Sequence, residues 1–266
     1  MGSPADRDEA KFALHATRAR SFGAHAAAYA EHRPDYPVAA IRWALAAVAD
    51  RRPLTVLDLG AGTGKLTEGL LEIGATVIAV EPDEHMRAEL IRRFPHVTAH
   101  AGAAEAIPLA DASVDAIAAG QAFHWFDLDR AYPEFIRVLR PGGVLAALWN
   151  TDDSSVEWVA GLKQVAGSSV STALPPSGQG DLPAHPLFGE HVIERSTFPH
   201  RHRRTAESLT ATIGTQSHLL VISPEERAEV LGRISDYLRG RPETTEGEFD
   251  LPILTLALRS TLRAAD

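Results

Sequence analysis

The sequence predicts an α/β fold built on one open, mostly parallel sheet, and three observations indicate it. Between Thr55 and Trp149, short apolar runs of strand length alternate with amphipathic runs of helix length. The apolar runs, such as 77–80, contain almost no polar residues, as is typical of parallel strands buried on both faces. A glycine-rich turn joins the first run to a helix. Alternation of this kind favours right-handed crossovers and a parallel sheet.

The expected elements follow in chain order. Helices at 13–30 and 38–51 form an arm before the sheet and are separated by the proline-bounded turn 33–37. Strands are expected at 55–59, 76–80, 97–100, 114–119 and 144–149, with helices at 65–73, 83–94 and 128–139 between them. After Asn150 the alternation ends, and 167–186, rich in Gly, Pro and Ser, is expected to be a loop. A strand at 192–198, helices at 206–213 and 224–239 and a strand at 249–258 follow, with Pro252 unusual inside a strand.

Length and composition limit the classes of protein. The 266 residues are expected to form a single domain, with a helical arm at 12–52, a core at 53–150 and an acceptor cap with the last two strands at 151–266. The chain has no cysteine, which excludes disulfides and thiolate ligands. Histidines such as His200 and His202 lack a helical i, i+4 spacing or an acidic partner, so no metal is expected.

Charge and hydropathy limit the partners. A net charge of -9 argues against nucleic acid, and the one basic run, 201–204, is interpreted as a solvated surface. No apolar stretch has membrane-spanning length and no secretory leader is visible, so a cytoplasmic protein without a membrane partner is expected. Both a monomer and a homodimer are compatible with the sequence.

The turn after the first strand carries the strongest chemical signal. Residues 58–64 read Asp-Leu-Gly-Ala-Gly-Thr-Gly. A phosphate-binding P-loop is excluded because Leu59 and Leu66 stand where it needs a glycine and a hydroxyl. A dinucleotide fingerprint fails at its third small position, which is Lys65. The alternating glycines instead suit a tight turn that lets a ligand approach the backbone, and Asp58 suits a cationic group on that ligand.

Two further segments lie at the carboxyl ends of expected strands. The second strand ends at Glu81, 21 residues after Gly60, where a carboxylate can accept hydrogen bonds from both ribose hydroxyls of an adenosine. The fourth strand is followed by 121–126, Gln-Ala-Phe-His-Trp-Phe. Ligands of open α/β sheets bind outside the carboxyl ends of the strands, so these segments are expected to share a site.

With these motifs in order, residues 29–150 resemble the class I S-adenosylmethionine-dependent methyltransferases, and among them the trans-aconitate-methyltransferase-like and ubiquinone-biosynthesis-methyltransferase-like enzymes. The matching motifs are 29–37, 58–64, 81–82, 100–109, 114–115, 121–126 and 140–143. The resemblance implies a Rossmann-like fold with seven strands, the last antiparallel, helices on both faces and a C-terminal helical cap. It also implies methyl transfer from S-adenosylmethionine, with S-adenosylhomocysteine as product, to oxygen, nitrogen or carbon of a small molecule, for example a bacterial secondary metabolite.

The resemblance also implies roles for individual residues. The cofactor-binding residues would be Tyr29, Arg33, Asp58, Gly60, Ala61, Gly62, Gly64, Glu81, Pro82, Met86, Ala104, Glu105, Gln121, Ala122 and His124. Arg33 would pair with the methionine carboxylate, and ordinary packing of the arm is the alternative. His124 is the candidate catalytic base, because imidazole titrates near neutral pH; the alternative is that His124 and Trp125 only wall the cofactor pocket. Residues 215–218 are candidate acceptor contacts or a polar surface turn.

Two other functions stay open. An NAD-dependent oxidoreductase is disfavoured by Lys65 and by the absence of a Tyr-x-x-x-Lys pair. A non-catalytic protein could keep the S-adenosylmethionine pocket for binding or regulation. Calorimetry with each cofactor distinguishes the oxidoreductase from a methyltransferase. Turnover of a methyl acceptor distinguishes the non-catalytic protein from an enzyme.

Overall fold

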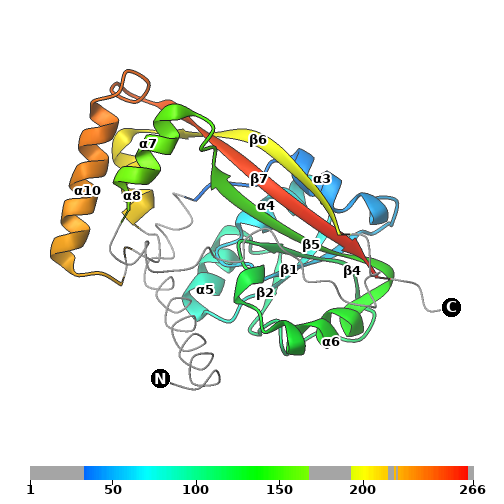
Figure 1. The fold of residues 1–266 in the computed structure, drawn as a ribbon. Coiled ribbons are helices and arrows are strands. Elements are labelled where there is room, and N and C mark those ends of the chain that lie inside the picture. Colours follow the sequence, from blue (N-terminus) through cyan, green and yellow to red (C-terminus); the bar gives the residue numbers. More distant parts are fainter. Residues whose placement is uncertain (1–32, 168–192, 215–218, 220, 263–266) are drawn as a thin grey trace, which may run out of the picture.

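The computed structural model describes residues 33–167, 193–214, 219 and 221–262 (Figure 1). The expected helix 13–30, Tyr29, nearly all of the expected loop 167–186, and the candidate acceptor contacts 215–218 lie outside the described residues. Among the described residues, no helix has both the length and the apolar character needed to cross a membrane.

Seven strands form one sheet in the order β3-β2-β1-β4-β5-β7-β6. They are β1 Thr55–Leu59, β2 Thr76–Val80, β3 Thr98–His100, β4 Val114–Gly120, β5 Leu139–Asp152, β6 Glu194–Arg204 and β7 Phe249–Thr261. Strands β1 to β5 pair in parallel, whereas β7 is antiparallel to both of its neighbours, β5 and β6. The predicted fold class, including the antiparallel last strand, is confirmed.

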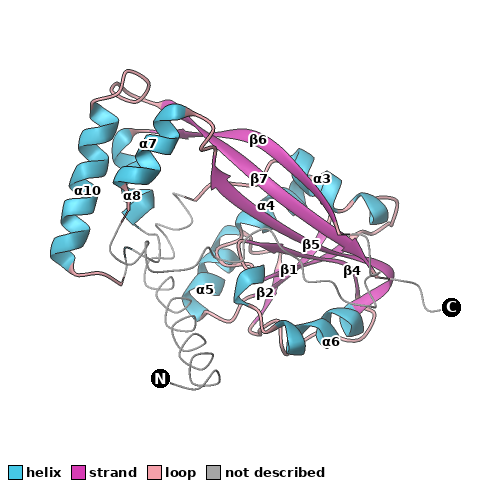
Figure 2. Ribbon diagram, viewed as in Figure 1, coloured by secondary structure: helices cyan, strands magenta, loops and turns pink. Residues whose placement is uncertain are grey.

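Helices cover both faces of this sheet and one end of it. They are α3 Val38–Ala44, α4 Lys65–Glu72, α5 Glu84–Arg93, α6 Leu128–Val138, α7 Glu157–Val165, α8 Ala206–Gly214 and α10 Pro224–Arg239, with short 3₁₀ turns at Ala46–Val48 and Phe123–Trp125. One apolar cluster packs α3, α4 and α5 on one face, and a second packs α6 on the other. A third joins α7, α8 and α10 to the start of β7 and forms the cap (Figure 2).

Some boundaries differ from the prediction. The helix expected at 38–51 stops at Ala44, because Leu45 leaves helical geometry (φ -101°, ψ 9°). Helix α7 was not expected, since its apolar stripe spans only nine residues. Strand β7 contains Pro252 just beyond its last pair with β5, Asp152 opposite Ile253, and the Pro252 carbonyl still accepts a hydrogen bond from the Asp153 N–H at 3.0 Å.

The basic run 201–204 is not the uniform solvated surface that was expected. Strand β6 continues through it at the edge of the sheet, and side chains of a strand alternate between its two faces. Arg201 and Arg203 are exposed and pair with Asp250 (3.3 Å) and Glu248 (2.8 Å) on β7 and just before it. Arg204 is buried instead, at 5% exposure, because its position faces the cap.

Candidate cofactor and acceptor site

A cavity of about 590 Å³ opens at the carboxyl ends of the parallel strands, next to α8 and the start of β7. This volume is typical of a site for a small molecule. Eleven of the predicted cofactor residues line it: Arg33, Gly60, Gly62, Glu81, Pro82, Met86, Ala104, Glu105, Gln121, Ala122 and His124. The turn after β1, the end of β2 and the segment after β4 therefore meet in one place.

A smaller cavity of about 40 Å³ adjoins the first and holds two more predicted residues, Asp58 and Ala61. Arg33 and Gln121 line both cavities. Gly64 lines neither of them. It is the N-cap of α4 with a φ of +87°, and a Cβ there would lie 2.7 Å from the Phe94 ring.

The glycine turn needs its glycines for two different reasons. Gly60 has a φ of +69°, and a Cβ on it would lie 2.6 Å from Cβ of Ala122, so the turn packs directly against the segment after β4. Gly62 has a φ of +57° and faces open space, because a Cβ on it would meet no atom within 4 Å. The left-handed backbone favours glycine at both positions. The open side at Gly62 leaves room for a ligand.

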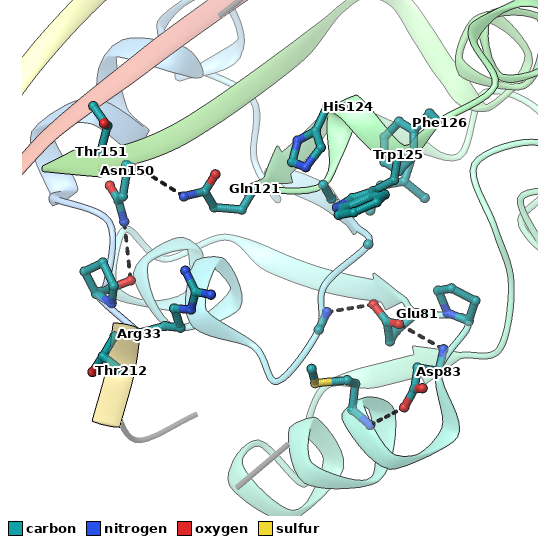
Figure 3. Close-up of a pocket in the computed structure, with 18 of the residues that line it drawn as sticks. Arg33, Glu81, Asp83, Gln121, His124, Trp125, Phe126, Asn150, Thr151 and Thr212 are labelled. Atoms are coloured by element: carbon teal, nitrogen blue, oxygen red, sulfur yellow. Dashed lines mark hydrogen bonds between the residues drawn. The ribbon is translucent and has the colours of Figure 1, made fainter. Parts of the chain in front are cut away.

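Glu81 ties this turn to the loop after β2. Its side chain is buried, and it accepts hydrogen bonds from the backbone N–H groups of Gly62 (2.8 Å) and Asp83 (2.9 Å) (Figure 3). Burial raises the pKa of Glu81, while these two donors oppose the rise. Each carboxylate oxygen has a second lone pair, so Glu81 can still accept hydrogen bonds from a ligand.

Asp58 is fully buried at the end of β1. Its Oδ2 accepts a hydrogen bond from the Thr67 hydroxyl (2.5 Å), whereas Oδ1 is buried without a hydrogen-bond partner among the described residues. Burial raises the pKa of Asp58 to about 7; the Thr67 hydrogen bond opposes the rise and the charge of Glu81 adds to it. A buried carboxylate oxygen without a partner is costly, and a cationic ligand group would satisfy it. The hydroxyl of Thr63, in the same turn, is unsatisfied in the same way.

The segment after β4 forms one wall of the larger cavity. Figure 3 shows Gln121, His124 and Trp125 side by side along it. Gln121 has a φ of +55°, which is uncommon for a residue with a side chain and is typical of functional sites. The indole N–H of Trp149 donates to Nδ1 of His124 at 3.4 Å.

We call residues 33–37 the strap. Its first residue, Arg33, lines both cavities. The Asn150 amide donates to the backbone carbonyls of Pro34 (3.3 Å) and Asp35 (3.1 Å). The Asp35 carboxylate pairs with Lys65 at 2.8 Å. Tyr36 is buried against Gly120, where a Cβ would lie 2.8 Å from the tyrosine oxygen.

Sequence reasoning missed most of the cavity's other end. The residues that line it there are Asn150, Thr151, Asp152, His202, Arg204, Leu209, Thr212, Ile213, Leu251 and Ile253. The first three end β5 and could have been found by the rule that ligands bind at the carboxyl ends of strands. The others come from β6, α8 and β7, whose positions depend on strand order and pairing rather than on a local motif.

Two of these residues, His202 and Asp152, have pKa values shifted from their ordinary values. Burial lowers the pKa of His202 to about 4, and the nearby Arg204 charge adds to the effect. Burial raises the pKa of Asp152, against the charges of Arg33 and Lys163. Among the residues that the structure describes, no three His, Asp or Glu side chains cluster in a way that could hold a metal ion.

The fold and this arrangement of residues define a class of protein. An open sheet whose last strand is antiparallel, a glycine turn beside a buried aspartate, and a carboxylate at the tip of β2 are the features of Rossmann-like proteins that bind an adenosine-containing cofactor at the carboxyl edge of the sheet.

Comparison with known proteins identifies the family. Residues 57–147 match the model of the methyltransferase domain of type 11. An uncharacterised methyltransferase of Mycobacterium tuberculosis is 39% identical over 244 residues, which cover 91% of this chain and 96% of the relative. One of Schizosaccharomyces pombe is 32% identical over 243 residues, with the same coverage. The chain therefore belongs to the class I S-adenosylmethionine-dependent methyltransferases.

A solved structure agrees with this assignment. A proposed type II methyltransferase from Anaeromyxobacter dehalogenans superposes with a TM-score of 0.65 at 29% identity, covering 87% of this chain and 97% of the other. The similarity thus extends well beyond residues 57–147.

Proposed function

We propose that the larger cavity, together with the smaller one that adjoins it, binds S-adenosylmethionine and that the enzyme methylates an oxygen, nitrogen or carbon of a small molecule, for example a secondary metabolite. The observation that carries the proposal is Asp58, a fully buried carboxylate with one unpartnered oxygen beside the open side of the glycine turn. The ammonium group of the cofactor's methionine part would satisfy that oxygen. The cofactor supplies an activated methyl group on its sulfonium.

The other lining residues support the same orientation. Glu81, on β2, would accept hydrogen bonds from the ribose hydroxyls through its remaining lone pairs. Pro82 and Met86 would flank the adenine, with Ala104 and Glu105 at its edge. At the opposite end, the Arg33 guanidinium would pair with the methionine carboxylate.

We further propose that Gln121, His124 and Trp125 align the acceptor. Methyl transfer from a sulfonium needs alignment and the exclusion of water, and it needs a base only where the nucleophile must lose a proton. An indole nitrogen only donates, so the Trp149 hydrogen bond uses the lone pair of His124 Nδ1 and leaves the proton of a neutral ring on Nε2. This tautomer favours His124 as a hydrogen-bond donor to the acceptor. A base role would require the other tautomer and the loss of the Trp149 bond.

The position and contacts of Lys65 disfavour the rival function, an NAD-dependent oxidoreductase. The dinucleotide fingerprint needs a small residue at this position for close helix packing, but Lys65 begins α4 and extends to Asp35 of the strap. Isothermal titration of the purified chain with S-adenosylhomocysteine and with NAD tests the choice. Binding of S-adenosylhomocysteine alone, in the micromolar range, is expected; a response to NAD alone would overturn the proposal.

A non-catalytic role for the same pocket is tested separately. Methyl transfer from labelled S-adenosylmethionine to panels of small acids, phenols and amines is expected to show turnover with at least one class. Tight cofactor binding without turnover on any panel would favour the binding protein.

A further inference from the structure

We propose that Asn150 is a positioning residue that fixes the strap and Gln121 at the cofactor site, and that Thr255 and His200 orient its amide from across the sheet. The inference rests on the proposed function, because the groups that Asn150 holds line the proposed cofactor site. None of the three residues belongs to a motif that sequence reasoning singled out.

Asn150 contacts two segments that are far apart in the sequence. It lies near the carboxyl end of β5 and is 8% exposed. Its side-chain Nδ2 donates to the backbone carbonyls of Pro34 and Asp35, and its own backbone carbonyl accepts from Nε2 of Gln121 at 2.8 Å (Figure 3). One residue thus holds both the strap and the first residue after β4.

The orientation of the Asn150 amide is imposed by the neighbouring strand. Thr255 on β7 is directly opposite Asn150 in the register and is fully buried. Its hydroxyl donates to Oδ1 of Asn150 at 2.6 Å. With the oxygen of the amide held there, the NH₂ group must face the strap, which presents two carbonyl oxygens and therefore needs a donor.

His200 on β6 completes the chain of hydrogen bonds. Its Nε2 lies 3.0 Å from the Thr255 hydroxyl oxygen. A hydroxyl has one proton, and Thr255 gives that proton to Asn150, so His200 must be the donor in this contact. The bonds therefore all run in one direction, from His200 at the edge of the sheet through Thr255 and Asn150 to the strap. His200 can donate from Nε2 whether its ring is neutral or charged.

Releasing the Asn150 amide is expected to disturb the strap, whereas the backbone carbonyl of residue 150 continues to hold Gln121. Arg33 and Pro34 of the strap line both cavities, so their position depends on the carbonyls that Asn150 holds. The unusual backbone of Gln121 is held by its N–H bond to Leu148 (2.9 Å) and by the side-chain bond to Asn150. A strained residue keeps its conformation only where its surroundings impose it.

Asn150→Asp tests the first part of the proposal. The carboxylate has nearly the same shape but no donor, and it would face two carbonyl oxygens. We expect the affinity for S-adenosylhomocysteine, measured by calorimetry at pH 7.5, to fall by roughly 10-fold or more, the scale of losing two buried hydrogen bonds. An affinity equal to that of the wild type would overturn the proposal.

Thr255 variants test the relay with matched controls. Thr255→Val removes the hydroxyl and is expected to weaken binding by roughly 3- to 10-fold, whereas Thr255→Ser keeps the hydroxyl and should bind within about twofold of the wild type. Thr261→Val makes the same change at an exposed position of the same strand and should have no effect. Equal losses in the Val and Ser variants would show that packing of the methyl group matters and would overturn the relay.

Hydrogen exchange separates positioning from general destabilisation. In Thr255→Val, amide exchange should become faster in the peptide that covers the strap and stay unchanged in the cap helices and at Gln121, which bonds to the backbone carbonyl of Asn150. Faster exchange in the cap as well, or no change at the strap, would contradict a positioning role. If the wild type itself does not bind S-adenosylhomocysteine, the proposed function fails. If the wild type and every variant bind equally, only the role of Asn150 fails.

Discussion

At the β1–β2 end of the cavity, the bonds that shape the site join residues close in sequence, whereas at the β5 end they join distant ones. Asp58 bonds to Thr67 and Glu81 to Gly62, over 9 and 19 residues. Asn150 bonds to Pro34 over 116 residues and accepts the Thr255 bond over 105. A local motif thus encodes the β1–β2 end of the site, whereas strand order and pairing encode the β5 end, where Asn150 holds the strap.

The largest expected effect separates chemistry from cofactor binding. His124→Ala should lower methyl transfer by roughly 100-fold, the scale of losing one hydrogen-bond donor to the reacting groups, and should leave affinity for S-adenosylhomocysteine within about twofold. Turnover is measured with labelled cofactor and an acceptor found by screening, and affinity by calorimetry. A parallel loss of cofactor affinity would place His124 in the wall of the cofactor pocket instead.

The next largest effect is a loss of cofactor affinity at the β1–β2 end, where the contacts join residues close in sequence. Glu81→Ala removes the acceptor of the Gly62 and Asp83 N–H groups together with the proposed ribose contact. Affinity for S-adenosylhomocysteine should fall by about 1 to 3 kcal/mol, as for charged hydrogen bonds, while a change at the exposed Glu84 of α5 serves as the control. Calorimetry that shows an unchanged affinity would remove Glu81 from the site.

A pH profile tests Asp58 at the same end. Its pKa of about 7 lies above the ordinary value of 3.8, so in the ligand-free enzyme the folded state holds this proton more tightly than the unfolded state. As pH rises from 4 to 7, the unfolded state loses this proton while the folded state keeps it, so folding stability should fall. The proposed ammonium contact needs the ionised form, and with a pKa of about 7 the ionised fraction falls from one half at pH 7 to about one tenth at pH 6. Affinity for S-adenosylhomocysteine should therefore fall roughly 5-fold over this range.

Asp58→Asn supplies the control for this profile. The variant has no charge to titrate at this position, so its affinity should be lower at pH 7 and should change less with pH. A wild-type profile as flat as that of the variant would contradict the role of Asp58.

The smallest effect is expected from the cap. Ile234 on α10 is fully buried in the cap cluster and does not line the cavity. Ile234→Val should lower the free energy of unfolding by about 0.5 to 1.5 kcal/mol, measured by denaturant titration. Affinity for S-adenosylhomocysteine should stay within about twofold. A larger loss of affinity would mean that packing within the cap also shapes the proposed cofactor end.

The β1–β2 end of the site could be predicted from the sequence, whereas most of the β5 end could not. The strand and helix alternation from β1 to β5 was predicted because buried parallel strands have a strong apolar pattern. The turn from Asp58 to Gly62 was predicted because its backbone geometry restricts the residue types. The hydrogen bonds that join Asn150, Thr255 and His200 could not be predicted, since nothing in the local sequence shows that β7 pairs beside β5. Arg204 was interpreted as surface because a run of basic residues does not show which of them turn inward.

The position of β7 has a consequence for how the molecule is assembled during translation. Strand β7 is the last of the seven to leave the ribosome, yet it lies between β5 and β6, so β6 has no place in the sheet until β7 has been made. The glycine turn and Glu81 can come together earlier, from the nascent chain up to Asn150. Thr255 arrives with β7, and the amide of Asn150 is oriented toward the strap only then. The proposed cofactor end is therefore outlined first and secured by the segment that is synthesised last.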